Sequence, residues 1–280
     1  MTKVPQDTSA EEPDGGNLQV RLRRGPGSGD RPGLLNMALG TTDKNQQTAA
    51  RTAGFLYLFL GALAAFGQFY IRSGILVPAD VAQTTHNILA SERLFRIGIA
   101  SDLIGGASNA ALAVAFYVML EPVGSAIAML AAVWRLGEAV ILGHMTLNSM
   151  VVVNILSHSD RLVGFSADQI QTLTSIYLGA QGAEFSIGLV FYALGSTLFC
   201  YLLLKSRYIP RILAWWGLLG SLISMLSSLT IIVFPAASGI APNCYIPVGT
   251  FEIVTGFWLL FGGIRLPRIP NEPTVSSRPG

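Results

Sequence analysis

The sequence contains little charge for its length. Of its 280 residues, 12% are Asp, Glu, Lys or Arg, whereas an ordinary soluble domain contains about 25%. The formal net charge is only +2, so we expect no nucleic acid partner. Hydrophobic residues make up 51% of the chain and the mean hydropathy is +0.52. This composition excludes a typical soluble domain and predicts an integral membrane protein, whose first partner is the lipid bilayer.

Residues that usually hold cofactors are also scarce. The chain has two cysteines and three histidines, and it lacks a zinc-type cysteine cluster, an HExxH pattern, a GxSxG elbow and a glycine-rich phosphate loop. No lysine lies within an apolar block, which argues against a retinal Schiff base. Only His144 lies well inside such a block, so haem has no pair of axial histidines. We therefore expect no cofactor, no metal site and no catalytic residue, which argues against an enzyme.

The apolar residues gather into six blocks, each long enough to cross the hydrocarbon core of a bilayer as a helix. A membrane offers no water to an unpaired backbone group, so such blocks must be helical. The sequence thus predicts an all-α, polytopic membrane helix bundle with six transmembrane helices. The blocks are residues 53–71, 97–120, 125–155, 171–204, 211–234 and 246–264.

Two shorter segments carry helix start signals. Asp80 can cap a short helix on which Val81, Ile88 and Leu89 share one face, and we expect this helix to lie on the outer membrane surface. Ser166 and Gln169 stand three residues apart before the fourth block and match a capping box.

Outside the blocks, the composition changes. Residues 1–49 are rich in Pro, Gly and charge, which predicts a disordered cytoplasmic tail. Residues 50–266 form the predicted six-helix membrane domain, and residues 267–280 a second disordered tail. No apolar segment of a signal peptide follows the first basic residues. A translation start at Met37 instead of Met1 is a further hypothesis.

Basic residues in the flanking segments predict the orientation. With the amino terminus inside, the inner segments hold Lys44, Arg51, Lys205, Arg207, Arg211, Arg265 and Arg268. The outer segments hold only Arg72, Arg93, Arg96 and Arg161. Because positive charge favours the inner side, we expect both termini in the cytoplasm and the protein in the cell's inner (plasma) membrane. Cys200 and Cys244 then lie near opposite membrane faces, so they cannot form a disulfide.

Five ionisable residues lie inside the apolar blocks: Asp102, Arg135, Glu138, Glu184 and Glu252. An ionisable group near the bilayer centre costs a few kcal/mol, so it is normally paired or faces water. Arg135 can neutralise one carboxylate, either Glu138 one helical turn away or a carboxylate on a neighbouring helix. Four acids then face one base, so some of the acids should be protonated, hydrated or bound to an ion.

The same helix faces carry small residues that let helices approach closely, which indicates that the polar stripes face one another. They predict a polar pocket, open towards the outside, able to bind a cation, a proton or a small molecule. Its candidate residues are Arg135, Glu138, Glu184, Asp102, Glu252 and Gln181. His144 lies on the face of its helix roughly opposite Arg135, with Asn148 one turn further along. We expect His144 to form a hydrogen bond between helices rather than to bind a metal.

Several segments together resemble a known family: TARTAGFLYLFLGALAAFGQFYIRSG and the residues after it, then WRLGEAVILG, SIGLVFYALGSTLFCYLL, SRYIPRILAWWGLLG and FEIVTGFWLL. Over residues 48–265 the chain resembles the bacterial membrane protein family catalogued as domain of unknown function 4386. The resemblance implies a bacterial membrane protein of six to seven helices and carries no activity, cofactor or catalytic residue. It also implies that His and Asp often stand where this chain has Gln181 and Ser186, so neither residue is universally required.

Three functions remain open from the sequence. The first is a small transporter or ligand-binding protein that uses the polar pocket. The alternative is a non-catalytic structural or partner subunit, in which the buried charges only fix helix packing. The third is a lipid-modifying enzyme with a carboxylate as general base.

Overall fold

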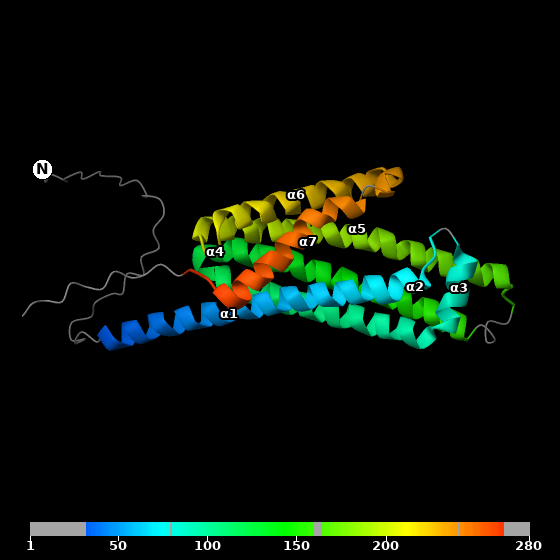
Figure 1. Ribbon diagram of the computed structural model, residues 1–280, viewed down its shortest axis with the longest axis horizontal. Helices are drawn as coiled ribbons and strands as arrows, with labels where there is room; N and C mark the ends of the chain where they lie inside the picture. Colours follow the sequence, from blue (N-terminus) through cyan, green and yellow to red (C-terminus); the bar gives the residue numbers. More distant parts are fainter. Residues whose placement is uncertain (1–31, 79, 159–163, 240, 266–280) are drawn as a thin grey trace, which may run out of the picture. The chain divides into compact units, whose positions relative to one another are not determined.

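The computed structural model describes residues 32–78, 80–158, 164–239 and 241–265. Residues 1–39 form one unit, of which only the helical residues from 32 onward are described, and residues 40–280 form the other. All regular structure in the described residues is helical (Figure 1). The long helices are α1 (Pro32–Phe66), α4 (Glu92–Ser157), α5 (Ala167–Ser206), α6 (Arg211–Val233) and α7 (Ala241–Phe257).

In the described residues, five short elements complete the bundle. A π-helix, η1 (Gly67–Arg72), and α2 (Ser73–Ile75) continue α1, and a second π-helix, η4 (Trp258–Gly262), continues α7. A 3-10 helix, η3 (Pro235–Gly239), follows α6. The helix predicted after Asp80 is α3 (Val81–Ala90), which runs across the direction of the long helices in Figure 1.

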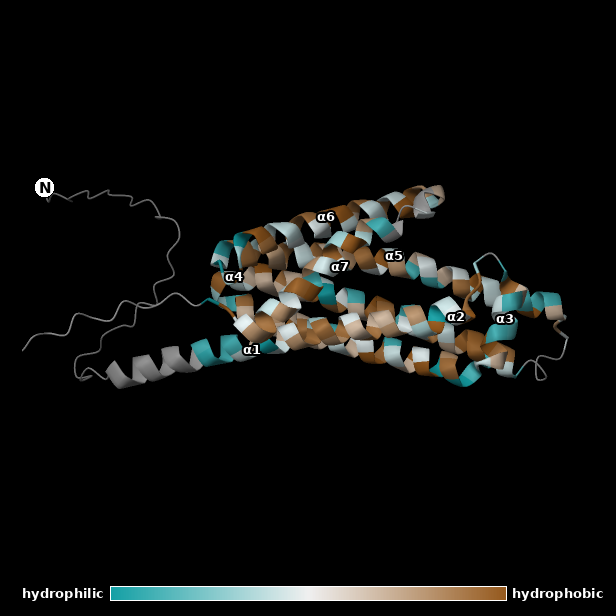
Figure 2. Cartoon of the chain, viewed as in Figure 1, coloured by the Kyte–Doolittle hydropathy of each residue, from teal (hydrophilic) through white to brown (hydrophobic). Residues whose placement is uncertain are grey.

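Five helical segments are long and apolar enough to cross a membrane, and hydrophobic residues cover much of their length (Figure 2). They are Asp43–Ile75, Glu92–Ser157, Ala167–Ser206, Arg211–Val233 and Asn243–Gly262. The predicted all-α membrane fold is therefore confirmed. The structure has five such segments in its described residues, whereas the sequence predicted six transmembrane helices. The difference arises because the predicted helices 97–120 and 125–155 belong to the single element α4.

Helix α4 is folded back on itself near its middle. Gly124 has extended backbone angles (φ 179°, ψ 87°) and Pro122 lies just before it, where the missing N–H and the ring of proline disturb a helix. Asn109 and Arg135 are 26 residues apart, yet their side chains are 2.6 Å apart; in a straight helix they would be about 39 Å apart. The two arms, residues 92–123 and 125–157, therefore lie side by side (Figure 1).

Helix α1 begins well before the predicted tail boundary at residue 49. Its first part contains Leu, Met, Ala, Gln and Lys residues, which favour helix. Gln46 is buried and donates hydrogen bonds to the Met119 carbonyl oxygen and the Tyr208 hydroxyl. This packing orders a segment whose composition indicated disorder. Residues 1–31 and the predicted tail at 267–280 lie outside the described residues.

Both predicted caps are present. The Asp80 carboxylate accepts a hydrogen bond from the Gln83 N–H at 2.8 Å. Ser166 and Gln169 form the reciprocal capping box, with each side chain accepting from the other residue's backbone N–H. These caps satisfy N–H groups that have no partner inside the helix.

The bundle has two apolar cores with a polar layer between them. In α4, residues 112–132 contribute to the larger core, and residues 95–99 and 152–156 to the smaller one. The intervening residues 101–109 and 135–149 hold the buried polar side chains of this helix. Polar groups are thereby kept in one layer, with apolar packing on both sides.

Gly54 allows α1 to contact the end of α7. A Cβ atom at this position would lie 2.5 Å from the Leu260 backbone nitrogen and 2.7 Å from the Gly256 carbonyl oxygen. Real Cβ atoms do not approach backbone so closely, so only glycine fits here without a shift of the helices.

Candidate functional site

A cavity of about 200 Å³ lies in the polar layer. We call it the central cavity. Helix α1, both arms of α4, α5 and α7 contribute to it. Its lining residues are Leu60, Leu63, Ala64, Ser101, Asp102, Gly105, Gly106, Asn109, Arg135, Glu138, Leu142, Met145, Tyr192 and Glu252.

Arg135 is the most extensively bonded side chain of the cavity. It is 4% exposed, so its charge depends on protein partners. Its Nη2 donates to Asn109 Oδ1 at 2.6 Å, its Nη1 is 3.0 Å from Glu138 Oε2, and its guanidinium carbon lies 4.4 Å from the centre of the Tyr192 ring. The predicted ion pair between Arg135 and Glu138 is confirmed.

Gly195 on α5 makes room for this arrangement. A Cβ atom there would lie 2.7 Å from Arg135 Cγ and 2.8 Å from the Ala131 carbonyl oxygen. Helix α5 therefore approaches the second arm of α4 closely enough to bring Tyr192 over the guanidinium, where a ring face attracts a cation.

Glu252 enters the cavity from α7 with a neutral partner. The Tyr192 hydroxyl donates to Glu252 Oε1 at 2.8 Å. Across the described part of the chain, no ion pair includes Glu252, and no hydrogen bond reaches its Oε2. One carboxylate oxygen is thus available to an occupant of the cavity.

Asp102 pairs with an arginine that the sequence placed in an outer loop. Arg72 Nη2 lies 2.8 Å from Asp102 Oδ2. The count of four acids against one base is therefore wrong, because η1 carries Arg72 back onto the first arm of α4. Arg72, Asp102 and Gln181 also line an adjoining space of about 20 Å³, which is large enough for one water molecule.

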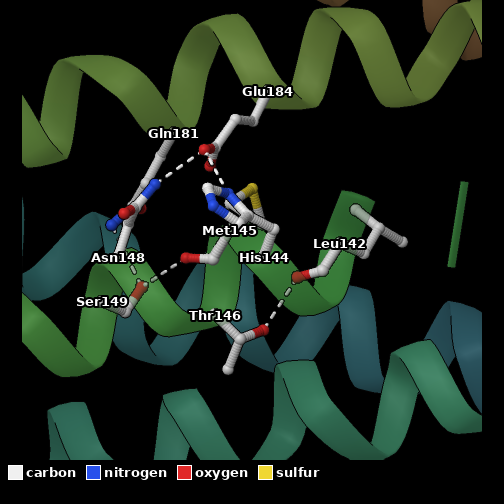
Figure 3. Close-up of polar contacts among 8 residues, drawn as sticks. All are labelled: Leu142, His144, Met145, Thr146, Asn148, Ser149, Gln181 and Glu184. Atoms are coloured by element: carbon white, nitrogen blue, oxygen red, sulfur yellow. Dashed lines mark hydrogen bonds and ion pairs between the residues drawn. The ribbon is translucent and has the colours of Figure 1, made fainter. Parts of the chain in front are cut away.

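Glu184 belongs to a separate cluster between α4 and α5 (Figure 3). His144 Nδ1 lies 2.7 Å from Glu184 Oε1, and Asn148 Nδ2 donates to the same oxygen at 2.7 Å. Gln181 donates to Ser149 Oγ at 3.0 Å. The predicted interhelical hydrogen bond of His144 is confirmed, and we call these five residues the His144 cluster.

The structure thus divides the six candidate residues. Asp102, Arg135, Glu138 and Glu252 line the central cavity. Glu184 and Gln181 lie in the His144 cluster, and Gln181 also lines the adjoining water-sized space. On α5 the cavity is instead reached by Tyr192, eight residues after Glu184 and about 12 Å further along the helix axis.

Tyr192 and Arg72 belong to the site but were not predicted from the sequence. Tyr192 is one aromatic residue in an apolar block, and nothing in its spacing marks it as facing an arginine. Arg72 directly follows the first block and was interpreted as a loop residue. Its signal is this position, next to the block's last apolar side chain.

Membrane-length helices that surround a polar cavity define a polytopic helical membrane protein. The chain belongs to the family described as Domain of unknown function (DUF4386), which matches residues 52–263 and so includes every residue of the central cavity. The family predicted from the sequence is thereby confirmed. No curated protein and no solved structure matches the chain. Its function must therefore be argued from the cavity.

Proposed function

We propose that the protein binds a small solute in the central cavity, as a binding protein or small transporter of the inner (plasma) membrane. One observation supports this most directly: ionisable side chains from separate helices converge on a space of about 200 Å³ inside an otherwise apolar bundle. Ionisable residues within membrane segments commonly mark substrate or ion pathways.

The proposal includes six membrane crossings, with each arm of α4 crossing once and α3 lying on the outer surface. Contacts that bring basic segments together support this orientation. The Arg265 N–H donates to the Tyr208 carbonyl oxygen, and the Ile264 N–H donates to Gln47. Lys205 Nζ reaches the Val123 carbonyl oxygen at the fold of α4. The end of the bundle so defined is rich in Lys and Arg and is assigned to the cytoplasm.

Water access to the cavity tests the proposal. Ser101 lines the cavity, whereas Ser221 is fully buried and does not. In a background with Cys200 and Cys244 replaced, Ser101→Cys should react with a hydrophilic thiol reagent in lipid membranes, and Ser221→Cys should not. Equal, negligible labelling of both folded variants would mean a closed cavity and would overturn the proposal.

A second candidate function is supported by the pairing of the ionisable side chains. Arg72 with Asp102, Arg135 with Glu138, and His144 with Glu184 are each within 3.0 Å. Such pairs also suit a non-catalytic structural or partner subunit, in which polar contacts fix helix packing. This alternative predicts an unreactive Ser101→Cys and no ligand.

A further inference from the structure

We infer that the occupant of the central cavity is a small organic monocation, a protonated primary alkylamine whose ammonium group binds Glu252. This inference rests on the proposed solute-binding function and names the ligand class of the same site.

The charge balance around the cavity gives the sign of the ligand. The cavity is lined by the acids Asp102, Glu138 and Glu252. Arg72 pairs with Asp102 and Arg135 pairs with Glu138. Glu252 has only the neutral Tyr192 hydroxyl as its partner. With all groups ionised, the site carries one excess negative charge, and in an apolar bundle a cationic ligand stabilises this ionised state.

The size and polarity of the lining distinguish between kinds of cation. A space of about 200 Å³ is much larger than a proton or a bare metal ion requires. The lining also includes the apolar side chains of Leu60, Leu63, Ala64, Leu142 and Met145. A hydrated metal ion gains nothing from such groups, whereas an alkyl chain is removed from water against them.

The position of Tyr192 favours a primary over a quaternary ammonium. Quaternary ammonium ions are held mainly by aromatic faces, but the ring of Tyr192 already contacts the Arg135 guanidinium at 4.4 Å. The free Oε2 of Glu252 is instead a hydrogen-bond acceptor. A primary ammonium can donate to it, and a charge-assisted hydrogen bond is stronger than a neutral one.

Binding of n-butylammonium chloride to the full-length protein in lipid nanodiscs tests the inference, by calorimetry and thermal unfolding at neutral pH. The probes for comparison are 1-butanol, butyrate, tetramethylammonium and sodium ions. We expect saturable binding and a raised Tm with butylammonium, and neither with the neutral or anionic analogue. Glu252→Gln should weaken butylammonium binding about tenfold or more.

Glu121→Gln is the matched control, because the Tyr117 hydroxyl donates to Glu121 at 3.3 Å at an exposed site outside the cavity. It should leave binding unchanged. The comparison of butylammonium with butanol, butyrate, tetramethylammonium and sodium uses the wild-type protein, so the test remains decisive where Glu252→Gln fails to fold.

Equal binding of butanol, stronger binding of tetramethylammonium or sodium, or unchanged binding by folded Glu252→Gln would each overturn the inference. If Ser101→Cys is labelled but butylammonium does not bind, the solute site stands and the ligand class is wrong. If Ser101→Cys is also unreactive, both proposals fail.

Discussion

At the scale of single residues, the ion pair of Arg135 and Glu138 is the critical element of the polar layer. Both side chains are at least nine-tenths buried. Glu138→Leu leaves the guanidinium with only neutral partners, and removing one member of a buried pair costs about 3–5 kcal/mol. We expect a loss of stability of that size in chemical unfolding in lipid or detergent.

The double variant Arg135→Met/Glu138→Leu should recover much of this loss, since it removes the uncompensated charge. The control is Glu92→Gln, which breaks the half-exposed pair with Arg96 and should leave stability nearly unchanged, because water screens such a pair. A double variant no more stable than Glu138→Leu would contradict this account.

The sequence predicts contacts within one helix better than contacts between helices. Arg135 and Glu138 are three residues apart, so helical geometry alone brings them together. Arg72 and Asp102 are 30 residues apart, and their meeting depends on how η1 packs on α4. For His144 the sequence predicted a hydrogen bond between helices, because a polar group inside an apolar block needs some partner. It did not identify Glu184 as that partner.

At the scale of helices, the close contact of α1 with α7 should be sensitive to one methyl group. Gly54→Ala places a Cβ atom against the backbone of residues 256 and 260. Overpacking typically costs about 1–3 kcal/mol, so we expect a lower Tm. Gly61→Ala on the same helix meets nothing within 4 Å and should be neutral or slightly stabilising, since alanine favours helix. Equal effects of the two substitutions would exclude close packing at Gly54.

Hydropathy locates helices but not their ends or connections. The apolar blocks coincide with the observed helices because bilayer length and backbone hydrogen bonding constrain both. The start of α1 was missed because it depends on tertiary contacts such as those of Gln46. In α4, the break was placed correctly at residues 121–124, and within this stretch the backbone angles depart from helical values at Gly124.

At the scale of the whole molecule, the fold of α4 determines how many times the chain crosses the membrane. Its arms contact each other through Arg135 and Asn109, so the ends of α4 lie on the side opposite its fold. If each arm spans the bilayer, the segment before α4 and the segment after it face the same compartment, and the fold at Gly124 faces the other.

Three single cysteines in the Cys200 and Cys244 replacement background test this topology, because His86, Glu121 and Asp168 are all exposed. With a membrane-impermeant maleimide and intact cells whose outer surface is accessible, His86→Cys and Asp168→Cys should be labelled. Glu121→Cys should be labelled only after permeabilisation, since it lies beside Lys205 and the other basic residues assigned to the cytoplasm. Labelling of all three from one side would mean that α4 does not cross twice, and the reverse pattern would keep six crossings but place the termini outside.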